Sequence, residues 1–284
     1  MKQLNWEDKG ISINGSFLSH LRFADDLVLI AHSSQEADNL LRELDSSTSP
    51  HGLRINIQKT VLMRNKHADQ HPVSFHSNPL PETDSFVYLG REINMQKELA
   101  PEILRRQRAG WAAYHRIEPV LRASRDVKLK ANLFNSTVIP ALTYAGETWA
   151  FTEKTERKLR VTQANIERRM VGITLRQQRE QNLHNTDLRR LTQVHDAVDR
   201  VNYSKHRWAG HIMRRFDNRW TRELTEWRPY NYKRPRGRPP MRWADSIRFR
   251  CAQKTGNPYI PWQSLARNRV QWNATWDSQL SNRP

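Results

Sequence analysis

The sequence is poor in cysteine and has no long apolar run. Its 284 residues include one cysteine, Cys251, which excludes an internal disulfide and any zinc site built from cysteines. We therefore expect a reducing compartment, such as the nucleus or cytoplasm. No apolar run approaches the roughly 18 residues of a membrane span, and residues 1–6 lack the apolar stretch of a signal peptide. These absences predict an intracellular protein with no membrane partner.

Acidic residues are also scarce, and the shortage is uneven along the chain. The formal net charge is +18. Residues 200–284 hold nineteen Lys and Arg against five Asp and Glu, whereas residues 1–100 are slightly acidic. Seven of the ten Trp lie after residue 200. Basic residues interleaved with aromatic ones are typical of nucleic-acid binding, although a solvated basic surface around a small Trp-rich core is an alternative.

The chain is organised around residues 21–30, where Asp25 and Asp26 stand between two short apolar runs. The runs have the length and composition of strands and predict a β-hairpin with Ala24 and Asp25 at the turn. Ala is a poor residue for a two-residue hairpin loop, and such departures from local rules are expected at functional sites. Adjacent carboxylates favour a hard divalent cation such as Mg²⁺, although an Asp pair in a turn is often only solvated.

Three sequence boxes carry a resemblance to a known family. Residues 23–26 (FADD), 52–60 (GLRINIQKT) and 86–93 (FVYLGREI) resemble, in order and spacing, palm motifs of the reverse transcriptases of non-LTR retrotransposons. Residues 140–149 and 207–211 are similar to the RTE-like lineage of these elements. The resemblance extends from about Leu21 to the Trp-rich C-terminal segment.

The resemblance implies an α+β fold in three regions. Residues 1–98 would be a truncated palm of antiparallel strands plus a helix, carrying the metal-binding hairpin and a primer-grip-like hairpin. Residues 99–180 would be an all-α thumb, and residues 181–284 a basic, Trp-rich helical region. Composition supports the change of character near residue 100, where amphipathic helical patterns replace strand patterns.

The resemblance also implies roles for individual residues. Asp25 and Asp26 would bind Mg²⁺, and Lys59 would lie near the incoming triphosphate, so these three are the candidate catalytic residues. An RNA template and a DNA primer, or their duplex, would be the partners. The expected nucleic-acid contacts are the primer-grip residues and the thumb arginines, namely Tyr88, Leu89, Gly90, Arg105, Arg106, Arg108 and Arg116.

Catalysis by such a palm needs a further carboxylate from an upstream strand. Glu7 and Asp8 precede the hairpin, but their surroundings do not resemble that motif, and the fingers and nucleotide pocket have no counterpart here. We therefore expect the C-terminal part of an RNA-directed DNA polymerase that is inactive alone, retains nucleic-acid binding and uses Mg²⁺ only in a complete palm.

Residues 233–240 (KRPRGRPP) leave a second possibility open. The segment is similar to an AT-hook, whose arginines enter the narrow minor groove of A·T tracts; here they would be Arg234, Arg236 and Arg238. The competing interpretation is that this segment is the ordinary end of the thumb in this lineage. A non-enzymatic DNA- or RNA-binding protein is thus the alternative function.

Local patterns predict the remaining elements. His195, His206 and His211 do not share one helical face and predict no zinc site. Trp272 and Trp276 are four apart and predict a helical pair. The expected helices cover residues 34–49, 101–117, 127–139, 154–171 and 187–216, and the expected strands lie near residues 11–13, 53–58 and 86–93. We expect Ser33 or Ser34 to cap the first helix, Leu104 to lie in the apolar stripe of the second, Pro140 to break the third and Gly172 to end the fourth. His211 is expected to be a packed or hydrogen-bonding residue.

Overall fold

The computed structural model describes residues 4–217, 219–227, 237 and 241–276. The chain forms two compact units, each with its own contacts. The first, called the strand unit here, contains Met1–Tyr88, Ile93–Lys97 and Asn218–Arg234; the second, the helical unit, contains Leu89–Glu92, Glu98–Asp217 and Pro235–Pro284. The helical unit therefore continues through residue 180, where the resemblance placed a boundary.

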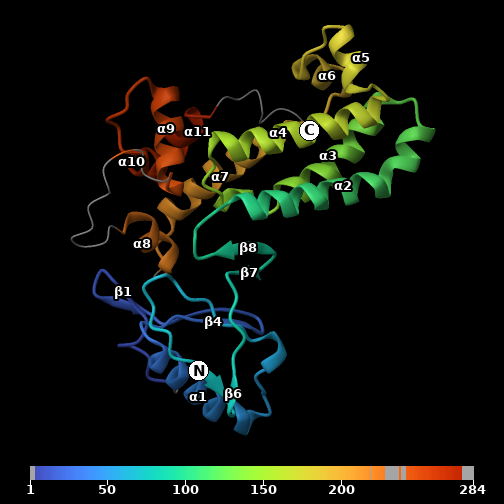
Figure 1. Ribbon diagram of the computed structural model, residues 1–284. Helices are drawn as coiled ribbons and strands as arrows, with labels where there is room; N and C mark the ends of the chain where they lie inside the picture. Colours follow the sequence, from blue (N-terminus) through green and yellow to red (C-terminus); the bar gives the residue numbers. More distant parts are fainter. Residues whose placement is uncertain (1–3, 218, 228–236, 238–240, 277–284) are drawn as a thin grey trace. The chain divides into compact units, whose positions relative to one another are not determined.

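The strand unit is built from short antiparallel pairs (Figure 1). Its described strands form separate two-stranded sheets rather than one continuous sheet. In the last pair, residues Leu89–Glu92 belong to the helical unit, and the flanking residues belong to the strand unit. The pairs are β1 (Ile11–Ile13) with β2 (Ser16–Leu18), β3 (His20–Phe23) with β4 (Asp26–Leu29), β5 (Ser74–Phe75) with β6 (Asn78–Pro79), and β7 (Ser85–Tyr88) with β8 (Arg91–Asn94).

One helix, α1 (Ser34–Thr48), contributes three buried leucines, Leu40, Leu41 and Leu44, to the strand unit. Ser33 caps it by accepting a hydrogen bond from the Glu36 amide, which confirms the predicted cap. Leu40 and Leu44 are buried on one side of the helix with Trp6, since residues at helical spacing share a face. The unit also contains η1 (Ser49–His51), η2 (Ile57–Lys59) and α8 (Trp220–Glu226).

The predicted strand at residues 53–58 is wrong. The backbone there is irregular and ends in η2, where the Asn56 side chain accepts a hydrogen bond from the Lys59 amide. Leu53 is 63% exposed, whereas Ile55 packs against the core. The apolar alternation is real, but a strand needs a hydrogen-bonded neighbour, and none of the described strands pairs with this segment.

The helical unit has a long antiparallel arrangement at its centre, with α2, α3 and α4 running side by side (Figure 1). Its helices are α2 (Ala100–Ala123), α3 (Val127–Thr143), α4 (Glu153–Val171), α5 (Leu175–Glu180), α6 (Asn185–Thr192), α7 (Ala197–Arg214), α9 (Trp243–Thr255), α10 (Trp262–Arg267) and α11 (Arg269–Ala274), with the 3-10 turn η3 (Gly146–Thr148). A single cluster of buried side chains joins α2, α3, α4 and α7.

Several predicted helix limits need correction. Helix α3 continues through Pro140 because Ile139 and Leu142, on either side of it, are both buried in the core. The predicted 187–216 helix is two helices, α6 and α7, separated at Gln193, which adopts a left-handed conformation. Leu104, expected in the apolar stripe of α2, is 49% exposed. The limits of α4 and its left-handed Gly172 end agree with the prediction.

A second cluster packs α9, α10 and α11 against the C-terminal half of α7. Trp262 and Trp272 are buried in it. The predicted helical pair of Trp272 and Trp276 is wrong, because α11 ends at Ala274. Both rings instead pack on His206, which stacks on Trp272 with ring centroids 4.0 Å apart. Within the described part of the chain, every helix is too short or too polar to cross a membrane.

Candidate nucleic-acid interface

The hairpin of β3 and β4 presents the two predicted metal ligands at its tip. Phe23 pairs with Asp26, so Ala24 and Asp25 form the two-residue turn, as predicted. Ala24 has φ of 50°, a left-handed conformation that costs an L-residue about 1–2 kcal/mol. Asp25 and Asp26 are both exposed. The strained turn thus holds two carboxylates next to each other in solvent.

The two faces of this hairpin differ sharply. Leu27 and Leu29 pack against the core of the strand unit. The opposite face carries Leu21 and Phe23, which are 37% and 61% exposed, together with Asp26, because paired residues project to one side of a sheet. Among the described strands β3 and β4 pair only with each other. The exposure of Leu21 and Phe23 shows that the described residues leave much of the carboxylate-bearing face open.

Tyr88 is the predicted site residue that lies in the electrostatic field of Asp26. Burial, and secondarily the negative charge of Asp26, raise the pKa of the Tyr88 hydroxyl. The structure therefore brings the primer-grip-like strand β7 close to the carboxylates within one unit. Lys59 is exposed at the end of η2, and its backbone amide makes the Asn56 contact described above. Among the described residues, no hydrogen bond or ion pair joins its side chain to Asp25 or Asp26.

The described residues do not assemble a complete divalent-metal site. Asp25 and Asp26 have the oxygen chemistry that Mg²⁺ prefers. Among the described residues, however, no group of three or more His, Cys, Asp or Glu side chains is placed to share one ion. Two exposed carboxylates are not enough for the two-metal arrangement of phosphoryl transfer, and we derive no catalytic step from them.

The turn of the β7–β8 hairpin, Leu89–Gly90, is anchored inside the helical unit. The Leu89 carbonyl accepts a hydrogen bond from the Tyr144 hydroxyl at 3.2 Å. The Gly90 carbonyl accepts from Arg105 at 2.7 Å and from Arg106 at 2.9 Å. Gly90 has φ of 76°, and a Cβ there would lie 2.8 Å from the Tyr144 ring. Both the backbone conformation and the close approach of Tyr144 require glycine.

Arg106 does not have the exposed position that a phosphate contact needs. Its side chain is 9% exposed and lies 2.8 Å from the fully buried Glu102 carboxylate. Glu102 also accepts from the Glu92 amide at 2.8 Å and contacts Arg105 at 3.4 Å. Arg105 and Arg106 therefore both hold the turn. The burial of Arg106 corrects its predicted role in nucleic-acid contact, whereas the role of Arg105, whose side chain is 35% exposed, stays a prediction.

The other predicted arginines divide into two groups. Arg108 and Arg116 are exposed on α2, so they are available to a polyanion. Arg234, Arg236 and Arg238 lie outside the described residues, and their predicted AT-hook role stays a prediction.

A basic surface that the sequence patterns did not reveal lies where α7 ends. Arg207 and His211 are exposed on one side of α7, and Arg269 is exposed at the start of α11. Phe216, two residues beyond α7, is 94% exposed. Exposed aromatic rings among cations are the usual means of stacking bases beside a bound backbone. We call Arg207, His211, Arg269 and Phe216 the α7 surface.

Electrostatics show how concentrated this positive charge is. The pKa of His211 is lowered, and the largest cause is desolvation. The positive charges of Arg214, Arg207, Arg215 and Arg269 also lower it. The five groups come from two segments that are distant in sequence, so only the folded helical unit brings them together. His211 was expected to be a packed residue; it is instead exposed within a basic cluster.

Comparisons with known proteins place the chain in a family. No family model matches the sequence. The chain is 46% identical over 276 residues to F52C9.6, a transposon-derived protein of Caenorhabditis elegans, in a match that covers 95% of this chain and 99% of the relative. The chain belongs to a family of transposon-derived proteins. No solved structure matches it.

The three sequence boxes predicted that this transposon-derived protein descends from a retrotransposon. The similarity to the relative confirms descent from a transposon. The specific lineage, a reverse transcriptase of RTE-like non-LTR elements, stays a prediction. So do the magnesium site and the nucleic-acid partners.

Proposed function

We propose that this transposon-derived protein is the C-terminal part of a non-LTR retrotransposon reverse transcriptase that binds nucleic acid and does not polymerise by itself. The observation that carries the proposal is the geometry of the β3–β4 tip. Ala24 adopts a strained left-handed conformation in a two-residue turn, and the adjacent Asp25 and Asp26 are exposed beside Tyr88. A purely structural hairpin would favour Gly or Asn at the turn.

The open side of the same hairpin supports inactivity in isolation. Leu21 and Phe23 are exposed on the face that carries Asp26, which is where another strand and its carboxylate would complete a palm. Mg²⁺ bound there would stabilise charge on the reacting oxygens. Because the described residues supply only two adjacent ligands, we expect such binding to require a further segment.

The α7 surface supports retained nucleic-acid binding. Phosphate contacts from Arg207 and Arg269 would position a strand without reading its sequence, and Phe216 offers a ring on which a base could stack. The exposed Arg108 and Arg116 of α2 add positive charge to the same unit.

Primer extension tests the first half of the proposal. The purified chain is incubated with an RNA template, a DNA primer, deoxynucleotides and Mg²⁺, with an active reverse transcriptase as the positive control. We expect no extension, because the described residues supply only two adjacent metal ligands. Robust extension that disappears in Asp25→Asn would contradict the proposal of an inactive part.

Salt-dependent binding tests the second half. Fluorescence anisotropy with labelled single-stranded DNA should show affinity falling steeply as KCl rises. Arg207→Ala and Arg269→Ala should each reduce the salt slope by about one. Arg176→Ala is the matched control, since Arg176 is exposed on α5 and paired with Glu180. Equal losses in all three variants would contradict a defined surface.

Sequence preference distinguishes the AT-hook alternative. If the tail binds A·T tracts, duplexes rich in A·T should bind more tightly than G·C duplexes, and the preference should disappear in Arg236→Ala/Arg238→Ala. Binding through the α7 surface should instead be nearly independent of sequence and unaffected by that double variant.

A further inference from the structure

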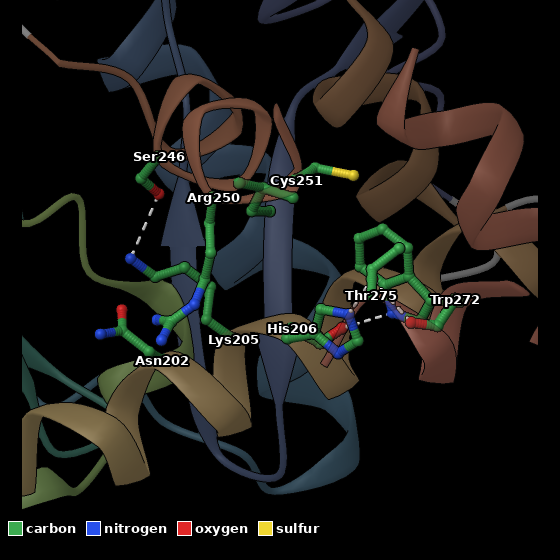
Figure 2. A pocket seen from close by; sticks show the side chains of 9 residues that line it. Asn202, Lys205, His206, Ser246, Arg250, Cys251, Trp272 and Thr275 are labelled. Carbon is green, nitrogen blue, oxygen red and sulfur yellow. Dashed lines mark hydrogen bonds between the residues drawn. The ribbon is translucent and has the colours of Figure 1, made fainter. Parts of the chain in front are cut away.

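A small pocket with both polar and apolar lining lies between α7 and α9 of the helical unit. Asn202 and Lys205 line it from α7, and Ser246 and Arg250 from α9. Figure 2 shows the side chains of Asn202, Lys205 and Arg250 gathered on one side of the pocket, with Trp272 on the other. The cavity measures about 20 Å³, enough to hold about one water-sized group.

Lys205 is an unusual residue to bury. It is 3% exposed, and its ammonium lies 5.4 Å from the centre of the Phe151 ring. It donates one hydrogen bond, to the Ser246 hydroxyl at 3.2 Å, and Ser246 in turn donates to the Trp243 carbonyl at 2.6 Å. An ammonium has three donors, so the described contacts leave it under-satisfied, which is costly for a buried charge.

The neighbouring charges do not neutralise this ammonium. The pKa of Lys205 is lowered to about 8, chiefly by burial and secondarily by the nearby Arg250 guanidinium, although Glu156 acts to raise it. Arg250 also stacks on Trp276 at 4.2 Å and acts on the Asp199 carboxylate. At neutral pH the pocket therefore contains two cations, with Glu156 and Asp199 as the carboxylates that act on them. A bound anion would relieve both the repulsion and the missing hydrogen bonds.

The donor set identifies the chemistry of that anion. Lysine, arginine, hydroxyl and amide groups together are the usual ligands of phosphate oxygens. The size of the cavity admits one oxygen, with the rest of the group at its mouth. We propose that Lys205, Arg250, Ser246 and Asn202 form a phosphate-binding pocket that takes one phosphate oxygen inside.

The pocket can be tested on the full-length chain without assuming any enzymatic activity. Inorganic phosphate is titrated by calorimetry and thermal melting against chloride at matched ionic strength. We expect saturable binding and a higher Tm in phosphate. Lys205→Met and Arg250→Met should each weaken phosphate binding by roughly tenfold, as for loss of one charge-assisted hydrogen bond. Arg248→Met is the matched control, because Arg248 is exposed on the same helix.

A measurement on the wild-type protein tests the proposal even if the variants fail to fold. The NMR signal of the Lys205 side chain is followed against pH with and without phosphate, and bound phosphate should raise the pKa of Lys205. A Lys205 pKa and a Tm that change neither with inorganic phosphate nor with short single-stranded DNA would mean that the cavity holds only water, and they would overturn the proposal.

Two sources of phosphate are separated by a second titration with short single-stranded DNA. If inorganic phosphate shifts the Lys205 signal, the pocket accepts a free phosphate group. If only DNA shifts it, and Lys205→Met removes that shift, the source is a nucleic-acid backbone. Arg207→Ala/Arg269→Ala distinguishes this proposal from the function proposed above, because it should weaken DNA binding and leave the response to inorganic phosphate intact.

Discussion

The strand unit and the helical unit use their apolar residues differently. In the helical unit, one continuous cluster joins four helices, and the buried Glu102 carboxylate is paired with Arg105 and Arg106. In the strand unit the described strands form isolated pairs, and Phe23 and Leu21 remain exposed. The difference teaches that four of the described helices share one extended core, whereas the described strands are joined only in separate pairs. We therefore expect substitutions in the two units to change stability by different amounts.

Removing the buried charge of Glu102 should give the largest effect. Glu102→Gln leaves Arg106 buried without its anion and weakens the anchor of the Leu89–Gly90 turn. Loss of one partner from a buried pair costs about 3–5 kcal/mol. Urea unfolding measures the loss. Glu180→Gln, which breaks the exposed pair with Arg176, should change the unfolding free energy by less than about 1 kcal/mol; equal effects would contradict the contrast between buried and exposed pairs.

Acid should weaken the helical unit through His206. The pKa of His206 is lowered to about 4, chiefly by burial and then by the charges of Arg250 and Arg214, whereas a hydrogen bond with the Trp272 backbone acts to raise it. The unfolded chain therefore binds this proton first, and stability present above about pH 6.5 is lost as the pH falls toward 4. The full loss is about 3 kcal/mol for a shift of this size.

Urea unfolding at pH 7 and pH 4.5 measures this loss for the wild type and His206→Gln. The variant should lose less stability on acidification, because it lacks the titrating group. His211→Gln is the control on the exposed side of the same helix. If all three proteins respond alike, His206 does not govern the acid response.

Sequence reasoning succeeded where local chemistry decides the structure. The Ser33 cap, the Ala24–Asp25 turn and the Gly172 helix end were all predictable, because each depends on a few adjacent residues. The strand at residues 53–58 could not be judged locally, since it depends on a pairing partner. Arg106 looked like a surface residue until the fold placed Glu102 and Gly90 against it.

The dependence on contacts between distant segments also explains why the sequence did not reveal the α7 surface. Arg207 and Arg269 belong to different helices, and no spacing rule connects them. Both arginines lower the pKa of His211, and they can do so only when the helical unit is folded. The weak signal available in advance was the high basic content after residue 200, which indicated a polyanion partner but could not say where it binds.

A paired substitution compares backbone strain in the two units. Ala24 in the strand unit and Ala145 in the helical unit both have positive φ, 50° and 55°. Replacing either by Gly removes the steric strain but adds unfolded-state entropy, for a net stabilisation of at most about 1 kcal/mol. Unfolding monitored by hydrogen exchange should assign each gain to its own unit. A loss of stability in Ala24→Gly would show that the turn is not strained.

The smallest effect is expected at the carboxylates themselves. Asp26→Asn lies on an exposed hairpin tip and should change stability by less than about 0.5 kcal/mol. It should nevertheless lower the pKa of Tyr88, because the charge of Asp26 is one of the two causes that raise it. NMR titration of the Tyr88 ring measures the change, with Asp8→Asn, another exposed carboxylate of the strand unit, as the control. If Asp26→Asn leaves the Tyr88 pKa unchanged, Tyr88 does not lie close to Asp26. The geometric support for a site shared by β7 and the hairpin tip would then be lost, even if both strands are correctly formed.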